Sequence, residues 1–251
     1  MVLGFKNRFH LCELFGIPIY LDITFAFILL TFMIDTPATY GLAFALLLAV
    51  SIVAHELGHS LMARAFGYPT TDITLSLLGG CASLIALPRK AYQEFLTAVA
   101  GPAVSFLLSA VFYGAFYIFP IENAWLAIVL YFGSLMNLTL GLFNCLPALP
   151  MDGGRVFRSA LRLWLTRERA TYVAMIVGRV CAVLLVVLPL VGITHLGPIP
   201  INGYFFMRVL IAWMIWQEGY REYRLAKIEG DFRNWSQADF NARVSPPPYE
   251  R

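Results

Sequence analysis

The feature that most limits how this chain can fold is a series of six apolar runs, each long enough to cross a lipid bilayer. A hydrocarbon core about 30 Å thick needs roughly 20 apolar residues for one helical crossing. Hydrophobic residues make up 59% of the chain and charged residues 13%, which leaves too few polar side chains to cover a water-facing surface. The sequence therefore predicts an all-α membrane protein with about six transmembrane helices, near residues 17–34, 38–66, 94–119, 124–146, 171–193 and 203–219.

The positive charges predict how these helices are oriented. Nearly all Lys and Arg residues lie before the first run, around the loops after the second and fourth runs, or after the sixth. Six crossings place these regions on one side, and Lys and Arg favour the cytoplasmic side. We therefore expect a multi-pass protein of the cell membrane with both termini in the cytoplasm. The expected divisions are a cytoplasmic N-terminal segment (1–16), a transmembrane domain (17–220) and a mobile cytoplasmic tail (221–251).

Two further patterns bear on the fold and on partners. Residues 71–77 partly alternate polar and apolar side chains, and Gly79-Gly80 separates them from a second short apolar stretch. This pattern predicts a short β-hairpin over 71–86, between the second and third helices. The net charge is only +3, and the basic residues form no patch interleaved with aromatics, so nucleic acid is not an expected partner.

One pentad in the second apolar run carries the chemistry. His55 and His59 are four residues apart, so on a helix their imidazoles share one face and can bind one Zn²⁺. Glu56 lies beside them, where a carboxylate can activate metal-bound water as a general base. The alternative is a solvated helix face that carries these residues by chance. The almost wholly apolar residues 42–54 before the pentad favour the metal site, because ionisable groups inside a membrane helix are costly unless they are paired.

A catalytic zinc site usually has three protein ligands, so a further ligand is expected elsewhere. Asp152 is the best candidate, since Pro147 and Pro150 break the fourth run just before it and Gly153-Gly154 permit a tight turn after it. Spacing alone leaves two interpretations equally open. Either this broken segment presents Asp152 to the metal, or Asp152 merely N-caps a following helix.

Taken together, the membrane-embedded His-Glu-x-x-His and the downstream Asn-x-x-Pro-x-x-Pro-x-Asp-Gly-Gly-Arg resemble the site-2 protease family of intramembrane zinc metalloproteases. The resemblance extends to residues 77–80 and 98–102 and covers about residues 40–165, the core of the expected protease domain. It implies one zinc ion per chain, with His55, His59 and Asp152 as ligands and Glu56 as catalytic base. Asn144 matches a family asparagine implicated in holding substrate or the developing oxyanion.

The resemblance also implies the reaction and the partners. The expected activity is hydrolysis of transmembrane or membrane-proximal segments of membrane-protein substrates, as in regulated intramembrane proteolysis. No PDZ or paired CBS domain is expected, so regulation would come from the membrane core or a regulatory membrane partner. Ser105 stands where many members have Asn after Gly-Pro, which bears on a hydrogen bond between helices.

Three other functions remain to be weighed. One is a membrane zincin of another type, in which Glu218 supplies the third ligand. Another is a metal-ion transporter, although this sequence has only one broken helix where transporters commonly have a pair in two related halves. The last is a non-catalytic scaffold derived from a protease, against which the retained Glu56 argues.

Overall fold

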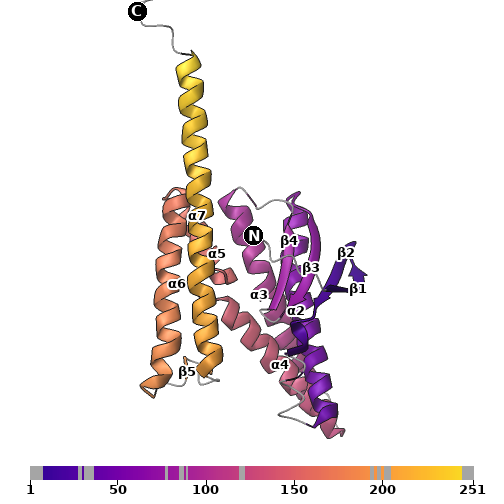
Figure 1. Ribbon diagram of the computed structural model, residues 1–251. Coiled ribbons are helices and arrows are strands. Elements are labelled where there is room, and N and C mark those ends of the chain that lie inside the picture. Colours follow the sequence, from indigo (N-terminus) through magenta and orange to yellow (C-terminus); the bar gives the residue numbers. More distant parts are fainter. Residues whose placement is uncertain are drawn as a thin grey trace, which may run out of the picture. The chain divides into compact units, whose positions relative to one another are not determined.

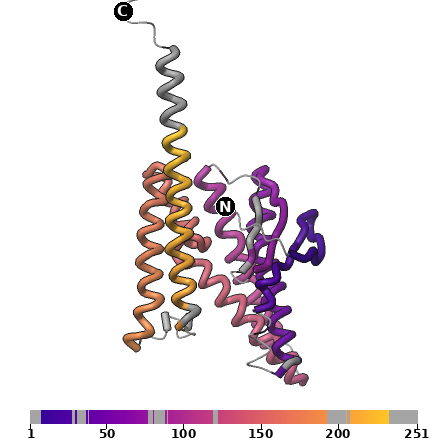
Figure 2. Tube along the Cα trace, in the orientation of Figure 1, coloured from indigo at the N-terminus to yellow at the C-terminus, as the bar shows by residue number. Residues whose placement is uncertain are grey.

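The computed structural model describes residues 8–27, 30, 37–76, 79–84, 88, 90–118, 122–192, 195–196, 199–200 and 205–244 (Figure 2). The chain divides into two compact units, Met1–Cys145 and Leu146–Arg251. Helices make up most of both units. Four of them are long and apolar enough to cross a membrane among the described residues.

Three of these four helices belong to the first unit. They are α2 (Ala38–Ala65), α3 (Ala91–Ile118) and α4 (Ala124–Asn144), and α3 packs against both others. They confirm the second, third and fourth predicted crossings. Asn123 caps α4, because its side chain accepts hydrogen bonds from the first backbone N–H groups of that helix. The buried Asn137 donates to Ser51 at 2.9 Å and so joins α4 to α2.

The first unit also contains a four-stranded sheet, so the all-α prediction is wrong there. Its strands are β1 (Arg8–Leu14), β2 (Ile17–Asp22), β3 (Thr70–Ser76) and β4 (Gly79–Leu84), in the order β1-β2-β3-β4 (Figure 1). The β1–β2 and β3–β4 pairs are antiparallel, and β2 pairs with β3 in parallel. β3 and β4 occupy the segment for which we expected a hairpin, of which residues 77–78 and 85–86 lie outside the described residues.

The predicted first crossing therefore begins as a strand. Phe15 and Gly16 have φ of 53° and 77°, the positive values that a tight hairpin turn requires. The chain then alternates, with Ile17 2% and Ile19 1% exposed and the residues between them less buried. This period of two belongs to a strand, and counting the length of the apolar run missed it. Residues 28–29 and 31–34 of this predicted crossing lie outside the described residues.

β2 runs beside α2 from the end of that helix toward its middle. The backbone oxygen of Phe15, in the turn before β2, accepts a hydrogen bond from Arg64 in the last turn of α2 at 2.6 Å. Ile17 then packs with Leu57, and beyond the strand Phe25 packs with Ile52. The sheet therefore reaches the level of the His-Glu-x-x-His pentad.

The second unit consists of α5 (Asp152–Leu161), α6 (Arg167–Leu190), α7 (Phe205–Val244) and a small ribbon of β5 (His195–Leu196) and β6 (Ile199–Pro200). α6 and α7 lie side by side (Figure 1). α6 confirms the fifth predicted crossing.

The C-terminal stretch after residue 220 corrects another expectation. We predicted a mobile tail over 221–251, but α7 continues as a helix to Val244. Part of the reason is that this portion of α7 has partners. Tyr223 packs on Tyr172 of α6, and Glu222 and Glu229 form ion pairs with arginines of the same unit. These contacts were not visible in a search for apolar periodicity.

Candidate metal centre

Two histidines on α2 form the centre of the site. Both side chains are buried, with His55 3% and His59 7% exposed. They lie one turn apart, and their Nε2 atoms are 3.2 Å from each other. Because α2 is a candidate membrane span, these two polar rings are held within a largely apolar helix, as the pentad predicted.

The other ring nitrogen of each histidine has a partner on α3. His55 Nδ1 lies 2.9 Å from Ser105 Oγ, and His59 Nδ1 lies 2.7 Å from the backbone oxygen of Thr97. The Thr97 carbonyl can only accept, so in the neutral ring His59 donates through Nδ1 and its Nε2 carries the acceptor lone pair. The same tautomer at His55 makes Ser105 an acceptor. Such bonds fix ring orientation in metal sites and raise ligand basicity.

The backbone of α3 approaches the histidines closely at Gly101. A Cβ atom at this position would lie 2.2 Å from His59 Nε2 and 2.8 Å from His55 Nε2. Gly58 permits the reciprocal approach, since a Cβ there would lie 2.8 Å from the backbone oxygen of Ala100. These two glycines therefore bring the helices together at the level of the imidazoles.

Glu56 lies on the side of α2 that faces the sheet. Its side chain is half-buried, and a Cβ at Gly80 of β4 would lie 2.5 Å from Glu56 Cγ and 2.9 Å from Oε1. The general base predicted from sequence therefore lies against the backbone of the last strand in the sheet.

Asp152, in the second unit, is the first residue of α5 and is buried, with 6% exposure. The N-cap position is Met151, and Asp152 is the first residue inside the helix, so the alternative role of Asp152 as an N-cap is wrong. Its carboxylate is a zinc-ligand type, and it is held in the second unit, whereas the two histidines belong to the first.

The donor set fits zinc. Two nitrogen ligands about 2.0–2.1 Å from one tetrahedral zinc ion lie about 3.3 Å apart, close to the observed 3.2 Å between the Nε2 atoms. Two imidazoles and a carboxylate are also the protein ligands of several catalytic zinc sites, where a fourth position stays open.

Comparison with known proteins identifies the family. The sequence profile of peptidase family M50 matches residues 43–121 and 119–188. The chain belongs to peptidase family M50. The M50 chain is 35% identical, over 96% of its length, to a Synechocystis sp. protein provisionally named a zinc metalloprotease. It is 31% identical, over 95% of its length, to zinc metalloprotease MJ0392 of Methanocaldococcus jannaschii.

The M50 chain spans 66% of the length of each of these two curated relatives. Its fold resembles the solved structure of the site-2 protease from Methanocaldococcus jannaschii, with a TM-score of 0.63 and 30% identity. That likeness covers 86% of this chain and 95% of the solved one.

Two other residues singled out from sequence lie differently. Asn144 ends α4, and its Nδ2 donates to Leu140 O of the same helix at 3.0 Å. Glu218, the rival third ligand, pairs with Arg221 of the same helix at 3.1 Å.

Sequence reasoning missed the supporting residues of this M50 site. Thr97 acts through its backbone oxygen, which no side-chain pattern can reveal. Ser105 was noted only as a departure from the family, yet it lies within hydrogen-bonding distance of His55. Gly101 belongs to the Gly-Pro segment of α3, which sequence reasoning used only as part of the family resemblance.

Proposed function

We propose that this M50 chain is a zinc-dependent intramembrane endopeptidase that hydrolyses a transmembrane or membrane-proximal segment of another protein. The observation that carries the proposal is the pair of buried imidazoles on α2, with Nε2 atoms 3.2 Å apart. The family match and the zinc metalloproteases among its relatives support the reaction class. The length and apolar character of α2 support a reaction within the membrane.

Each proposed site residue has a distinct task. His55, His59 and Asp152 hold one zinc ion, which when bound polarises the scissile carbonyl and lowers the pKa of water. Glu56 takes the proton from the attacking water and passes it to the leaving amine. Asn144 exchanges its bond to Leu140 for one to the substrate or the developing oxyanion.

The proposed topology keeps six crossings of the cell membrane, with both termini in the cytoplasm. Four apolar helices support it, and the distribution of Lys and Arg supports the orientation. The hydrogen bond from Arg64 to Phe15 also supports a first crossing. It holds residue 15 beside the C-terminal end of α2, whereas Ala38 starts the helix at the opposite end. The chain between them must travel that length.

The substrate is proposed to bind as an added strand on β4. A helical substrate hides its carbonyls, so it must unwind before hydrolysis. Among the described residues β4 is the last strand of its sheet, and its backbone lies against Glu56, so a strand added there would run near the general base.

Proline substitutions test this pairing. Along β4, successive N–H groups alternate between β3 and the outer edge. Ala82 and Ser83 are consecutive, so one of their N–H groups points toward β3 and the other toward the outer edge. Ala82→Pro and Ser83→Pro each remove one of these two groups. We expect the outward substitution to reduce cleavage in a folded protein. If the variant without the outward N–H group cleaves normally, β4 does not pair with substrate and only fills space beside the site.

The proposed activity is tested by comparing Glu56→Gln with Glu122→Gln, an exposed acidic residue given the same change. Glu56→Gln should keep its zinc and lose cleavage of membrane proteins by roughly 10²–10⁴-fold. Glu122→Gln should match the unmodified protein in both. Full cleavage by Glu56→Gln would refute the mechanism, and zinc uptake into vesicles by the purified protein would favour a transporter.

A further inference from the structure

The turn that leads into α5 is enclosed by three helices of the second unit. Ala148 and Leu149 are 0% and 1% exposed. A Cβ at Gly154 of α5 would lie 2.5 Å from the backbone of both. A Cβ at Gly178 of α6 would contact Ala148 at 3.4 Å, and one at Gly219 of α7 would lie 3.9 Å from Leu149 O. α5, α6 and α7 therefore all lie beside the turn that precedes Asp152, and the approach of α5 is close enough to require glycine at position 154.

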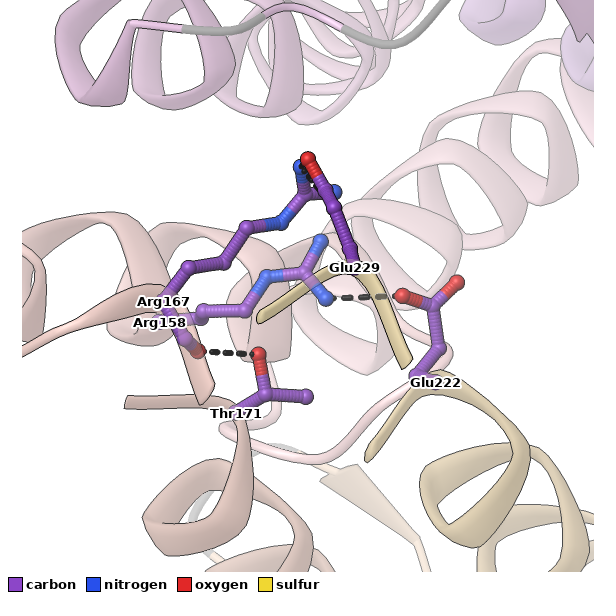
Figure 3. Close-up of polar contacts among 5 residues, drawn as sticks. All are labelled: Arg158, Arg167, Thr171, Glu222 and Glu229. Atoms are coloured by element: carbon purple, nitrogen blue, oxygen red, sulfur yellow. Dashed lines mark hydrogen bonds and ion pairs between the residues drawn. The ribbon is translucent and has the colours of Figure 1, made fainter. Parts of the chain in front are cut away.

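A buried ion pair holds the other end of α5. Arg158, in its last turn, extends toward Glu222 of α7, and their closest nitrogen and oxygen atoms are 2.7 Å apart (Figure 3). The side chain of Arg158 is only 4% exposed and that of Glu222 21%. Burial alone would raise the pKa of the Glu222 carboxyl. The charge and hydrogen bond of Arg158, with the charges of Arg155 and Arg167, lower that pKa below its ordinary value instead.

These contacts give α7 two points of attachment to the segment that carries Asp152. Gly219 and Glu222 are three residues apart and so share a face of α7. One lies near the turn before Asp152, and the other binds the helix that Asp152 begins. α7 starts at Phe205, beyond the residues 43–188 that the M50 profile matches. The family motifs therefore do not include this attachment.

We propose that α7 positions the metal ligand Asp152, and that Arg158 and Glu222 are the positioning residues. The inference rests on the proposed role of Asp152. α5 is a helix of only ten residues, and Arg158 near its end binds α7, so this attachment limits how its first residue can turn. Loss of the Arg158–Glu222 pair frees the last turn of α5 and lets the Asp152 carboxylate move away from the metal.

The same unit contains a natural control. Arg167 of α6 and Glu229 of α7 form a pair at 2.9 Å, also visible in Figure 3, but the Glu229 side chain is 49% exposed. This pair joins α6 to α7 and leaves α5 untouched. Glu222→Gln and Glu229→Gln remove the same charge from the same helix, seven residues apart in the sequence, and differ in whether the partner lies on α5.

The experiment measures the zinc affinity of the full chain in lipid nanodiscs and the visible absorption of its Co²⁺-substituted form. We expect Glu222→Gln and Arg158→Gln to weaken zinc binding by about 10–100-fold, the usual effect of losing an outer partner of a metal ligand. Their Co²⁺ spectra should lose the intensity of a tetrahedral site. Glu229→Gln should leave both properties unchanged. The charge-swapped double variant Arg158→Glu/Glu222→Arg should recover much of the affinity.

A matched apolar variant guards against simple misfolding. Arg158→Met/Glu222→Leu keeps the bulk of the buried pair without its charges, a replacement that often preserves folding. A folded double variant with weakened zinc supports ionic positioning, whereas one with normal zinc affinity and Co²⁺ spectrum overturns it.

The variant Asp152→Ala distinguishes a wrong positioning role for α7 from a wrong ligand assignment. If Asp152→Ala keeps normal zinc affinity, the ligand assignment itself is wrong. If Asp152→Ala loses zinc while Glu222→Gln binds it normally, the ligand assignment holds and α7 has no positioning role.

Discussion

The two units hold the proposed metal ligands in different ways, and these ligands are of different kinds. In the first, two histidines on an apolar helix are oriented by uncharged hydrogen bonds to α3, and a glycine lets the backbone approach them. In the second, a carboxylate begins a short helix that is held by glycine contacts and a buried ion pair. A ligand in the middle of a long helix needs only its ring fixed, whereas a ligand at a helix start needs the whole helix fixed.

The largest expected effect tests the first unit at Gly101. Gly101→Ala places a methyl group 2.2 Å from His59 Nε2, so one imidazole must leave its position. We expect zinc binding and cleavage to fall by more than about 100-fold, beyond the usual loss for an outer partner. Zinc content after dialysis and a cleavage assay measure this.

Gly114→Ala is the control on the same helix, because a Cβ there meets nothing within 4 Å. It should keep full activity. If Gly101→Ala and Gly114→Ala lost zinc binding and cleavage equally, the close approach of Gly101 to the histidines would not be the cause of the loss.

The next effect tests the second unit at Gly154. Gly154→Ala puts a methyl group 2.5 Å from the backbone of Ala148 and Leu149, which cannot yield as a flexible side chain can. We expect a loss of zinc affinity near 100-fold, the upper end for indirect positioning. Gly178→Ala makes only an ordinary contact of 3.4 Å with the same turn and should bind zinc almost normally. Similar zinc affinities in the two variants would show that packing against this turn does not position Asp152.

A smaller effect is expected at Ser105. Ser105→Ala removes the hydroxyl that lies 2.9 Å from His55 Nδ1, so the His55 ring loses a contact that helps to fix its orientation. Zinc affinity should fall about 10-fold, the lower end for such partners. Isothermal titration with a competing chelator measures it. Ser109→Ala, on the same helix but bonded to Ser134, is the comparison and should leave zinc affinity unchanged.

The smallest effect is a pH dependence of stability in the second unit. The pKa of Glu222 is lowered in the folded protein, mainly by Arg158 with help from Arg155 and Arg167 against the effect of burial. A lowered pKa contributes stability above the unfolded value that is lost as pH falls through the folded value. Thermal unfolding should therefore show the advantage of the unmodified protein over Glu222→Gln at pH 7 and a shrinking advantage below about pH 4. A constant difference from pH 7 to 3 would contradict this linkage.

The sequence predicted the histidine pair because the pair depends only on residues that are close together in the chain. Four residues on a helix make one turn, and the apolar surroundings made a chance match unlikely. Four crossings followed equally well from run length. Asp152 needed the family resemblance, because spacing alone left its roles as a ligand and as an N-cap equally open.

What the sequence did not predict depends on register between elements. Ser105 and Thr97 meet the histidines only because α3 lies at one particular height beside α2. Ile17 and Ile19 carried a strand period inside a run that was counted only for its length. Arg158 and Glu222 are 64 residues apart, so their pairing has no local signature in the charges of either helix.

The outer edge of β4, which pairs with no other strand among the described residues, has a consequence for water supply. In hydrocarbon, an unpaired backbone N–H or C=O costs several kcal/mol, and this edge lies at the level of Glu56. Between substrates its amides must be hydrated. If β4 receives the substrate as proposed, this edge is also the hydrated side of the site: an added peptide strand displaces water from it, and hydrolysis consumes one water molecule nearby.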